Sequence, residues 1–190
     1  DHGHVATHGK PMGLTNQFTA AGFDMERITL IPGTFGSLYT EDGNEQKRLV
    51  SWLQTQSWCG PIFARNLDGL PSGALPLSAA NCEHPRSGDI VFVLARDAVA
   101  PNGGLQGRCL HDNTEIPEGC GLHGGLSNYE VSSVLAFSGN LFASGQNILT
   151  PTGIIDVLPT VLHCLDINIP TLDGRVLSEA MHGIMPTSVR

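Results

Sequence analysis

The sequence predicts an α/β fold, with a layered mixed sheet flanked by helices. Apolar runs of strand length alternate with segments of helical periodicity, Gly and Pro residues separate these runs, and no motif repeats at a fixed period. Interleaved strands and helices favour a layered α/β architecture over an all-β or all-helical one. The 190 residues have the length of one ordinary domain.

The first predicted elements are a short helix and a hairpin. Residues 14–21 have the pattern of a short helix, which Gly22 ends. Two β-type runs follow, 27–31 and 37–40, and the Pro- and Gly-containing segment 32–36 between them is typical of a turn. We therefore expect two antiparallel strands here.

A second helix is predicted over residues 45–57. Asn44 is its candidate N-cap, because Asn is a favoured capping residue just before a periodic run. The charged residues of the first turns lie opposite an apolar stripe. This stripe, which we expect to face the core, consists of Leu49, Trp52 and Leu53.

Three further strands and a third helix complete the predicted fold. Runs 61–65 and 90–94 are β-branched and aromatic, and the second is apolar throughout, as expected for a strand covered on both faces. Residues 131–137 predict another buried strand. A helix is expected over 153–165, kinked or restarted at Pro159. Its expected inner side carries Ile154, Val157, Leu158, Val161, Leu162 and Leu165.

Charge and hydropathy exclude two classes of partner. Eighteen acidic residues against ten basic ones give a net charge of −8, with no run of like charge. A protein that binds the nucleic-acid backbone needs a basic surface, so nucleic acid is not an expected partner. The longest purely apolar run, residues 90–95, is far shorter than the roughly twenty residues that span a bilayer, so no membrane span is expected.

The five cysteines leave two interpretations open. Their number is odd, so at least one is free or pairs with another chain, and Cys164 in an apolar run is the candidate for the free one. Cys109 and Cys120 bracket a loop and are candidates for a disulfide. Alternatively, these two cysteines and two nearby histidines, His111 and His123, supply four zinc-type ligands.

Two segments carry candidate metal ligands. Asp1-His2-Gly3-His4 brings a carboxylate and two imidazoles together beside a glycine, and these ligand types suit zinc, manganese or iron. In Gly121-Leu122-His123-Gly124-Gly125, glycines leave space around the imidazole of His123. The alternatives are a solvated polar segment and a glycine-rich loop with an incidental histidine.

The same segments, with others in order, resemble a known family. The chain is similar to the C-terminal part of the alkaline phosphatase superfamily, in its nucleotide pyrophosphatase and phosphodiesterase branch, from Asp1 to about Ala180. The resemblance implies an alkaline phosphatase-like fold. The motifs that carry it are Asp1-His2-Gly3-His4, 84–90, Gly121-Leu122-His123-Gly124-Gly125-Leu126-Ser127 with 129–139, 153–162 and Asp173-Gly174-Arg175-Val176-Leu177.

The resemblance implies hydrolysis of phosphodiester or pyrophosphate bonds, with a phosphoester or nucleotide as the small-molecule substrate. A Thr or Ser attacks phosphorus and forms a covalent intermediate, while two divalent metal ions, zinc or else manganese or iron, neutralise the phosphoryl charge. Asp1 and His2 would bind one metal ion and His123 the other. The motif assigns no role to His4 or His8, which we expect outside the ligand set or at the surface.

The chain also departs from the family pattern. The nucleophile, two further carboxylates and another histidine precede the Asp-His-Gly motif in the family, and here that motif begins at residue 1. We therefore expect residues 1–190 to be the C-terminal part of one catalytic domain, whose upstream half is its partner. Segment 33–37, which contains Thr34, is interpreted as a turn and given no catalytic role. The alternative is a noncatalytic scaffold or binding module without the nucleophile half.

The cellular location follows from the resemblance and the cysteines. Cysteines in loops, and similarity to a family that is often exported, favour the periplasm or the extracellular space. The odd cysteine count keeps a cytoplasmic location open.

Overall fold

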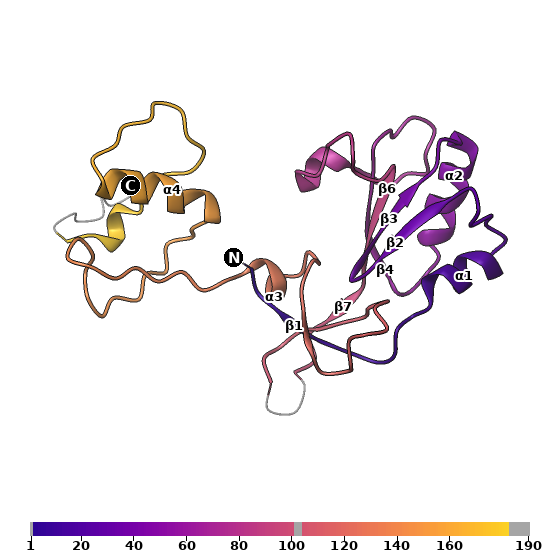
Figure 1. Ribbon diagram of the computed structural model, residues 1–190, viewed down its shortest axis with the longest axis horizontal. Helices are drawn as coiled ribbons and strands as arrows, with labels where there is room; N and C mark the ends of the chain where they lie inside the picture. Colours follow the sequence, from indigo (N-terminus) through magenta and orange to yellow (C-terminus); the bar gives the residue numbers. More distant parts are fainter. Residues whose placement is uncertain (1, 101–103, 183–190) are drawn as a thin grey trace. The chain divides into compact units, whose positions relative to one another are not determined.

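The computed structural model describes residues 2–100 and 104–182, which form two compact units (Figure 1). The first unit comprises residues 2–133, and the second comprises the described residues from 134 onward. Mixed sheets and helices make the chain an α/β protein, as predicted from the sequence.

A five-stranded mixed sheet forms the centre of the first unit. β2 and β3 form the predicted antiparallel hairpin, β6 lies between β3 and β4 and is antiparallel to both, and β5 joins β4 in parallel. The sheet order is β2 (Thr29–Pro32), β3 (Phe35–Tyr39), β6 (Ile90–Leu94), β4 (Cys59–Ala64) and β5 (Leu75–Pro76).

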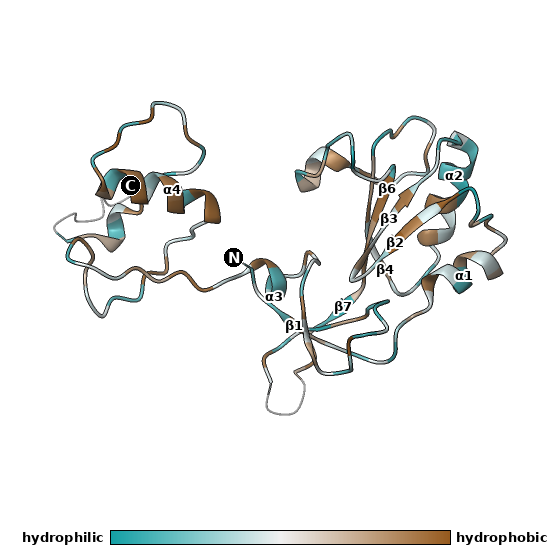
Figure 2. Cartoon of the chain, viewed as in Figure 1, coloured by the Kyte–Doolittle hydropathy of each residue, from teal (hydrophilic) through white to brown (hydrophobic). Residues whose placement is uncertain are grey.

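Both faces of this sheet are covered. α1 (Leu14–Ala20) and α2 (Gly43–Leu53) contribute buried side chains to a core with Ile90, Phe92 and Leu94 of β6. The 3-10 helix η1 (Leu77–Ala80) packs with Val93, on the opposite face of the same strand. Figure 2 shows hydrophobic residues concentrated along these strands. The prediction that residues 90–94 form a strand covered on both faces is confirmed.

Helix α1 receives its N-terminal cap from a distant residue. Its own N-cap position, Gly13, has a φ of 62° and offers no side chain. The carboxylate of Asp112 instead accepts hydrogen bonds from the backbone N–H groups of Gly13 and Leu14. These contacts satisfy two of the N–H groups that a helix leaves without partners at its start.

Helix α2 begins earlier than predicted and has a different cap. The Asp42 carboxylate accepts hydrogen bonds from the N–H groups of Asn44, at 2.9 Å, and Glu45, at 3.3 Å. The prediction of Asn44 as N-cap was therefore wrong, because Asp42 already satisfies the first N–H groups. The helix also ends at Leu53 rather than at residue 57, while the expected stripe does face the core, with Leu49 and Leu53 buried.

A smaller four-stranded sheet carries both segments that the sequence singled out for chemistry. Its strands are short, and β1 lies at its centre, parallel to β8 and antiparallel to β9. β7 follows β6 after a single residue, so the two sheets are joined through this strand. The order is β7 (Arg96–Asp97), β8 (Arg108–Cys109), β1 (Val5–Thr7) and β9 (Gly121–Leu122).

The buried strand predicted over residues 131–137 does not form. Residues Asn128–Val131 make the short helix α3, and the residues after it have no regular structure. Val134 is 93% exposed. An apolar run becomes a strand only when another strand pairs with its backbone groups, and within 2–100 and 104–182 no strand pairs with this run.

The second unit contains the predicted helix near residues 153–165. It begins as the 3-10 helix η2 (Ile154–Asp156) and continues as α4 (Val157–Cys164); η3 (Ser178–Ala180) follows later. Pro159 is the third residue of α4, where its missing N–H leaves no helical hydrogen bond unmade, and no break occurs there.

The predicted inner side of this helix was wrong for four of its six residues, whereas Val157 and Leu162 are half-buried. Pro159 and Thr160 are buried in the second unit, whereas Leu158 and Val161 are exposed, as are Ile154 and Leu165. The hydrophobic colouring along α4 in Figure 2 therefore includes the exposed Leu158 and Val161 as well as half-buried side chains. Among the described residues, no helix is both long and apolar enough to cross a membrane.

Candidate metal centre

Three histidines of the first unit form a cluster at one end of the smaller sheet. His2, His4 and His123 each offer a ring nitrogen, and these three atoms all lie within 4.8 Å of one another. The rings of His2 and His123 stack at a centroid distance of 3.7 Å, and the ring of His4 lies 5.0 Å from His2 and 5.2 Å from His123. His4 and His123 are exposed, and His2 is half-buried.

The pairing of β1 with β9 brings these residues together. Val5 pairs with Leu122 in an antiparallel register, so the residues just before Val5 lie beside those just after Leu122. His2 precedes β1 and His123 follows β9, and the antiparallel direction places the start of one strand at the end of the other.

Gly3 holds the first two histidines against helix α3. Its N–H donates a hydrogen bond to the carbonyl oxygen of Glu130 at 2.7 Å. A Cβ atom at this position would collide with the carbonyl oxygens of Tyr129 and Ser132. Only glycine permits this close approach of the backbone to α3. The positions of His2 and His4 beside that helix therefore depend on Gly3.

The loop that carries His123 is fixed by hydrogen bonds at that residue and at the residues after it. Thr34 Oγ1 donates a hydrogen bond to the carbonyl oxygen of His123 at 2.7 Å. Two residues further on, the Gly125 N–H donates to Glu130 Oε1 at 2.9 Å, and Ser127 Oγ donates to Oε2 at 2.7 Å. The loop is thus tied both to the hairpin of the large sheet and to Glu130.

Glu130 is a buried carboxylate with a complete set of partners. Arg96 binds it through two hydrogen bonds, Nε to Oε2 at 2.9 Å and Nη2 to Oε1 at 3.0 Å. Burial alone would raise the pKa of Glu130, but the hydrogen bonds from Arg96 and Ser127, the Arg96 charge and the Gly125 N–H together hold the pKa below its ordinary value. The carboxylate is therefore ionised at neutral pH.

The electrostatics at His123 favour the neutral form of its imidazole. Partial loss of solvent contact lowers the pKa of His123, and the neighbouring His2 and His4 lower it further. Neutral imidazole is the form that binds a metal ion. His2 Nδ1 lies 3.0 Å from the carbonyl oxygen of Gly3, which can only accept a hydrogen bond, so this nitrogen carries the proton.

The other candidate ligands of the sequence analysis lie elsewhere. Asp1 falls outside the described residues. His8 is not in the cluster: its Nδ1 lies 3.2 Å from a carboxylate oxygen of Glu118. His4, which the motif left without a role, is the third member instead. The sequence feature that could have identified His4 is its position two residues after His2, since alternate residues of an extended chain point to the same side.

The candidate disulfide between Cys109 and Cys120 does not form, and both residues are free thiols. Cys109 pairs with Thr7 on one side of β1, while the N–H of Thr7 donates to the carbonyl oxygen of Cys120 on the other side. Two strands separated by a third lie about 10 Å apart, beyond the roughly 7 Å that a disulfide allows between Cα atoms.

The alternative zinc set is not assembled either. His111 is completely buried, and within the described part of the chain the only group of three metal-binding side chains is the histidine cluster. His123 belongs to that cluster rather than to a site with Cys109, Cys120 and His111.

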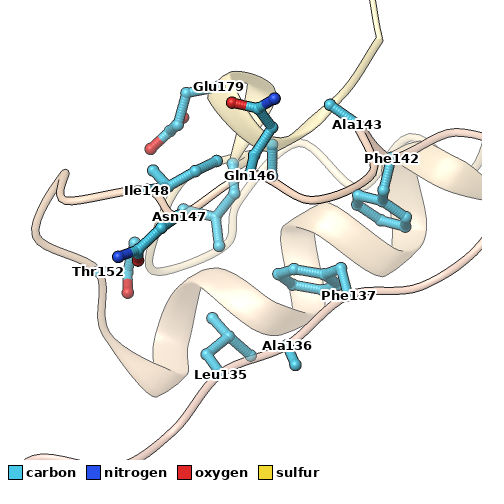
Figure 3. A pocket seen from close by; sticks show the side chains of 12 residues that line it. Leu135, Ala136, Phe137, Phe142, Ala143, Gln146, Asn147, Ile148, Thr152 and Glu179 are labelled. Carbon is cyan, nitrogen blue, oxygen red and sulfur yellow. The ribbon is translucent and has the colours of Figure 1, made fainter.

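The second unit contains a cavity of about 230 Å³ (Figure 3). The stacked rings of Phe137 and Phe142, 4.7 Å apart, contribute to its apolar wall, and Gln146 and Asn147 contribute amides. The one carboxylate in its described lining, Glu179, is bound by two hydrogen bonds from Arg175. This lining provides no group of metal ligands, so we assign the chemistry to the histidine cluster.

Comparison with known proteins identifies no relative: no protein-family model, curated protein or solved structure matches the chain. Function is therefore inferred from the histidine cluster and from the motifs of the sequence.

Proposed function

We propose that this chain contributes a metal centre, formed by His2, His4 and His123, to a metal-dependent hydrolase of phosphodiester or pyrophosphate bonds. The observation that carries the proposal is the convergence of three imidazoles from two distant segments. The phosphoester substrate class comes from the resemblance of these segments to the nucleotide pyrophosphatase and phosphodiesterase branch.

The ligand set suits a catalytic zinc ion better than a structural one. Catalytic zinc has three protein ligands and one open position for water or substrate, whereas structural zinc is closed by four protein ligands. Zinc–nitrogen bonds of about 2.0–2.1 Å require neighbouring nitrogens to lie about 3.3 Å apart. The three ring nitrogens, which lie within 4.8 Å of one another, would have to close to this spacing on binding, and the rings of His4 and His123 are exposed.

The hydrogen bond of His2 also fits a ligand role. A metal-bound histidine commonly donates its second ring N–H to a carbonyl or carboxylate oxygen, which orients the ring. His2 Nδ1 makes such a contact with Gly3, and this assigns Nε2 as its metal-binding nitrogen. When bound, the ion would polarise a phosphoryl oxygen and stabilise the charge that develops on it.

The proposal leaves two roles to polypeptide outside this chain, as the family resemblance implies: the Thr or Ser nucleophile and further metal ligands. The resemblance divides His2 and His123 between two metal ions, with Asp1 beside His2, whereas the proposed centre brings His2, His4 and His123 to one ion. The resemblance also favours the periplasm or the extracellular space as the location of the enzyme.

The first test is zinc binding by the chain and by a His123→Ala variant. We expect the chain to bind Zn²⁺ in a competition titration against a chromophoric chelator, and the variant to bind at least about 10- to 100-fold more weakly. His163→Ala, which removes an exposed histidine of α4, is the matched control and should bind like the wild type. Equal affinity of the His123→Ala variant would remove the cluster from the proposal.

The second test concerns the reaction. With the native polypeptide isolated from its source, bis(4-nitrophenyl) phosphate hydrolysis should stop when EDTA removes the metal and resume when Zn²⁺ is restored. His123→Ala should lower metal content and hydrolysis together. Zinc binding without any phosphodiesterase activity in that polypeptide would favour the noncatalytic binding module instead.

A further inference from the structure

We infer that the buried Arg96–Glu130 pair is a positioning element of the proposed metal centre, which sets the distance between His123 and the His2–His4 segment. This inference rests on the proposed function, because it assigns a role toward the same metal ion. Neither residue belongs to the cluster of candidate ligands.

Glu130 contacts both segments that carry the histidines. Its carboxylate accepts from the Gly125 N–H, two residues beyond His123. Its backbone carbonyl accepts from the N–H of Gly3, which lies between His2 and His4. One residue therefore connects the two halves of the cluster, and a shift of Glu130 would move both.

Arg96 fixes Glu130 to the large sheet. Their side chains are 8% and 1% exposed, so this pair is shielded from water. The guanidinium also donates to the carbonyl oxygens of Leu94, at 2.6 Å, and Thr34, at 3.3 Å. Since Thr34 in turn donates to the carbonyl oxygen of His123, the pair and the histidine loop share one hydrogen-bonded network.

The packing at Gly125 shows how little freedom the network has. A Cβ atom there would collide with Arg96 Nη2 and with both carboxylate oxygens of Glu130. The backbone of the loop therefore lies directly against the ion pair. Removing one partner of a buried pair leaves the other charge uncompensated, and the surrounding groups must rearrange.

The chain offers a mild and a severe way to disturb the network. Thr34→Val removes one buried hydroxyl with little change of shape, and Thr34→Ser keeps the hydroxyl. Glu130→Gln removes the charge of the pair. Thr160→Val is the matched control, because Thr160 is a fully buried threonine of the second unit whose hydroxyl also makes hydrogen bonds to the backbone.

The experiment is a titration of the wild-type chain and these variants with Co²⁺, at a temperature where each is folded. Co²⁺ reports its ligand geometry through its visible absorption bands, a signature that loss of global stability alone does not change. We expect Thr34→Val and Glu130→Gln to weaken Co²⁺ binding about 10- to 100-fold and to shift the bands. Thr34→Ser and Thr160→Val should keep the wild-type affinity and spectrum.

The outcomes separate this inference from the proposed function. If the wild type binds Co²⁺ and the Thr34→Val and Glu130→Gln variants keep its affinity and spectrum, the positioning role is overturned while the metal centre stands. If the wild type binds neither Co²⁺ nor Zn²⁺, the metal centre itself is overturned, and the inference with it. Should Glu130→Gln fail to fold, the Co²⁺ affinities and spectra of Thr34→Val and Thr34→Ser decide whether the positioning role stands.

Discussion

The imidazole rings of His2 and His123 stack at a centroid distance of 3.7 Å with an interplanar angle of 28°, although they come from opposite ends of the first unit in sequence. The contact depends on two short strands, β1 and β9, and on one residue of α3 that holds both segments. Partial burial, together with the neighbouring His2 and His4, lowers the pKa of His123, so this ring favours its neutral form.

His4 and His8 should differ sharply in their effect on zinc affinity. His4→Ala removes one of three imidazoles from the cluster, and we expect Zn²⁺ binding to weaken by at least about 10- to 100-fold. His8→Ala should leave the affinity unchanged, because His8 pairs with Glu118 away from the cluster. Isothermal titration calorimetry of both variants tests this, and equal losses would contradict the ligand set.

The stability that Glu130 provides should depend on pH. Its folded-state pKa lies below the ordinary value of 4.5, so its contribution is complete above about pH 4.5 and is lost as the pH falls through the folded pKa. We expect Glu130→Gln to lower the free energy of unfolding by about 3 kcal/mol at neutral pH.

This difference should shrink as the pH falls below about 4.5, where protonation of the wild-type carboxylate also breaks the pair. Urea unfolding of both proteins at several pH values gives the measurement. A difference that grows toward acid would mean that the Glu130 carboxylate is not stabilised in the folded state.

The cysteines should react as free thiols at different rates. Cys120 is exposed and should be alkylated first by iodoacetamide in the native protein. Burial raises the pKa of the Cys59 thiol to about 12, so little thiolate forms and alkylation is slow until the chain unfolds. Peptide mapping without reductant follows both sites, with Cys120→Ser as the control. A linked Cys109–Cys120 peptide pair would contradict the strand order described above.

The cap of α2 should be found by mutation at Asp42 and not at Asn44. Asp42→Ala removes the acceptor of two N–H groups and should cost about 1 kcal/mol of stability. Asn44→Ala removes a side chain that caps nothing and should change stability by less than half of that. Urea midpoints of the two variants make the comparison, and a larger loss at Asn44 would restore the original prediction from sequence.

Hydrophobic pattern was sufficient to predict four of the five strands of the large sheet, all except the two-residue β5. Residues 90–94 are apolar on both faces of a strand, and the structure covers both faces. The same criterion failed for residues 131–137, because apolarity does not reveal whether a pairing strand is present. It failed again for the face of α4, where Leu158 and Val161 lack a covering element among the described residues.

The site was only partly visible in the sequence for a related reason. His2 and His123 stood out because glycines flank them, whereas the importance of Glu130 depends on a partner from another sheet. An isolated glutamate in a polar segment normally remains in solvent, and only Arg96, Ser127 and Gly125 together make its burial favourable. Neither hydropathy nor spacing encodes such a long-range pairing.

The cap of α1 by Asp112 has a consequence for the order of folding. A helix of seven residues is not stable alone, and its first N–H groups find their acceptor almost a hundred positions later in the chain. During synthesis the N-terminal segment would leave the ribosome long before that carboxylate exists. Helix α1 is therefore expected to dock late, after β8 and the residues that follow it have been translated. The contact between Asp112 and the start of α1 then belongs to the slow, long-range part of the folding reaction.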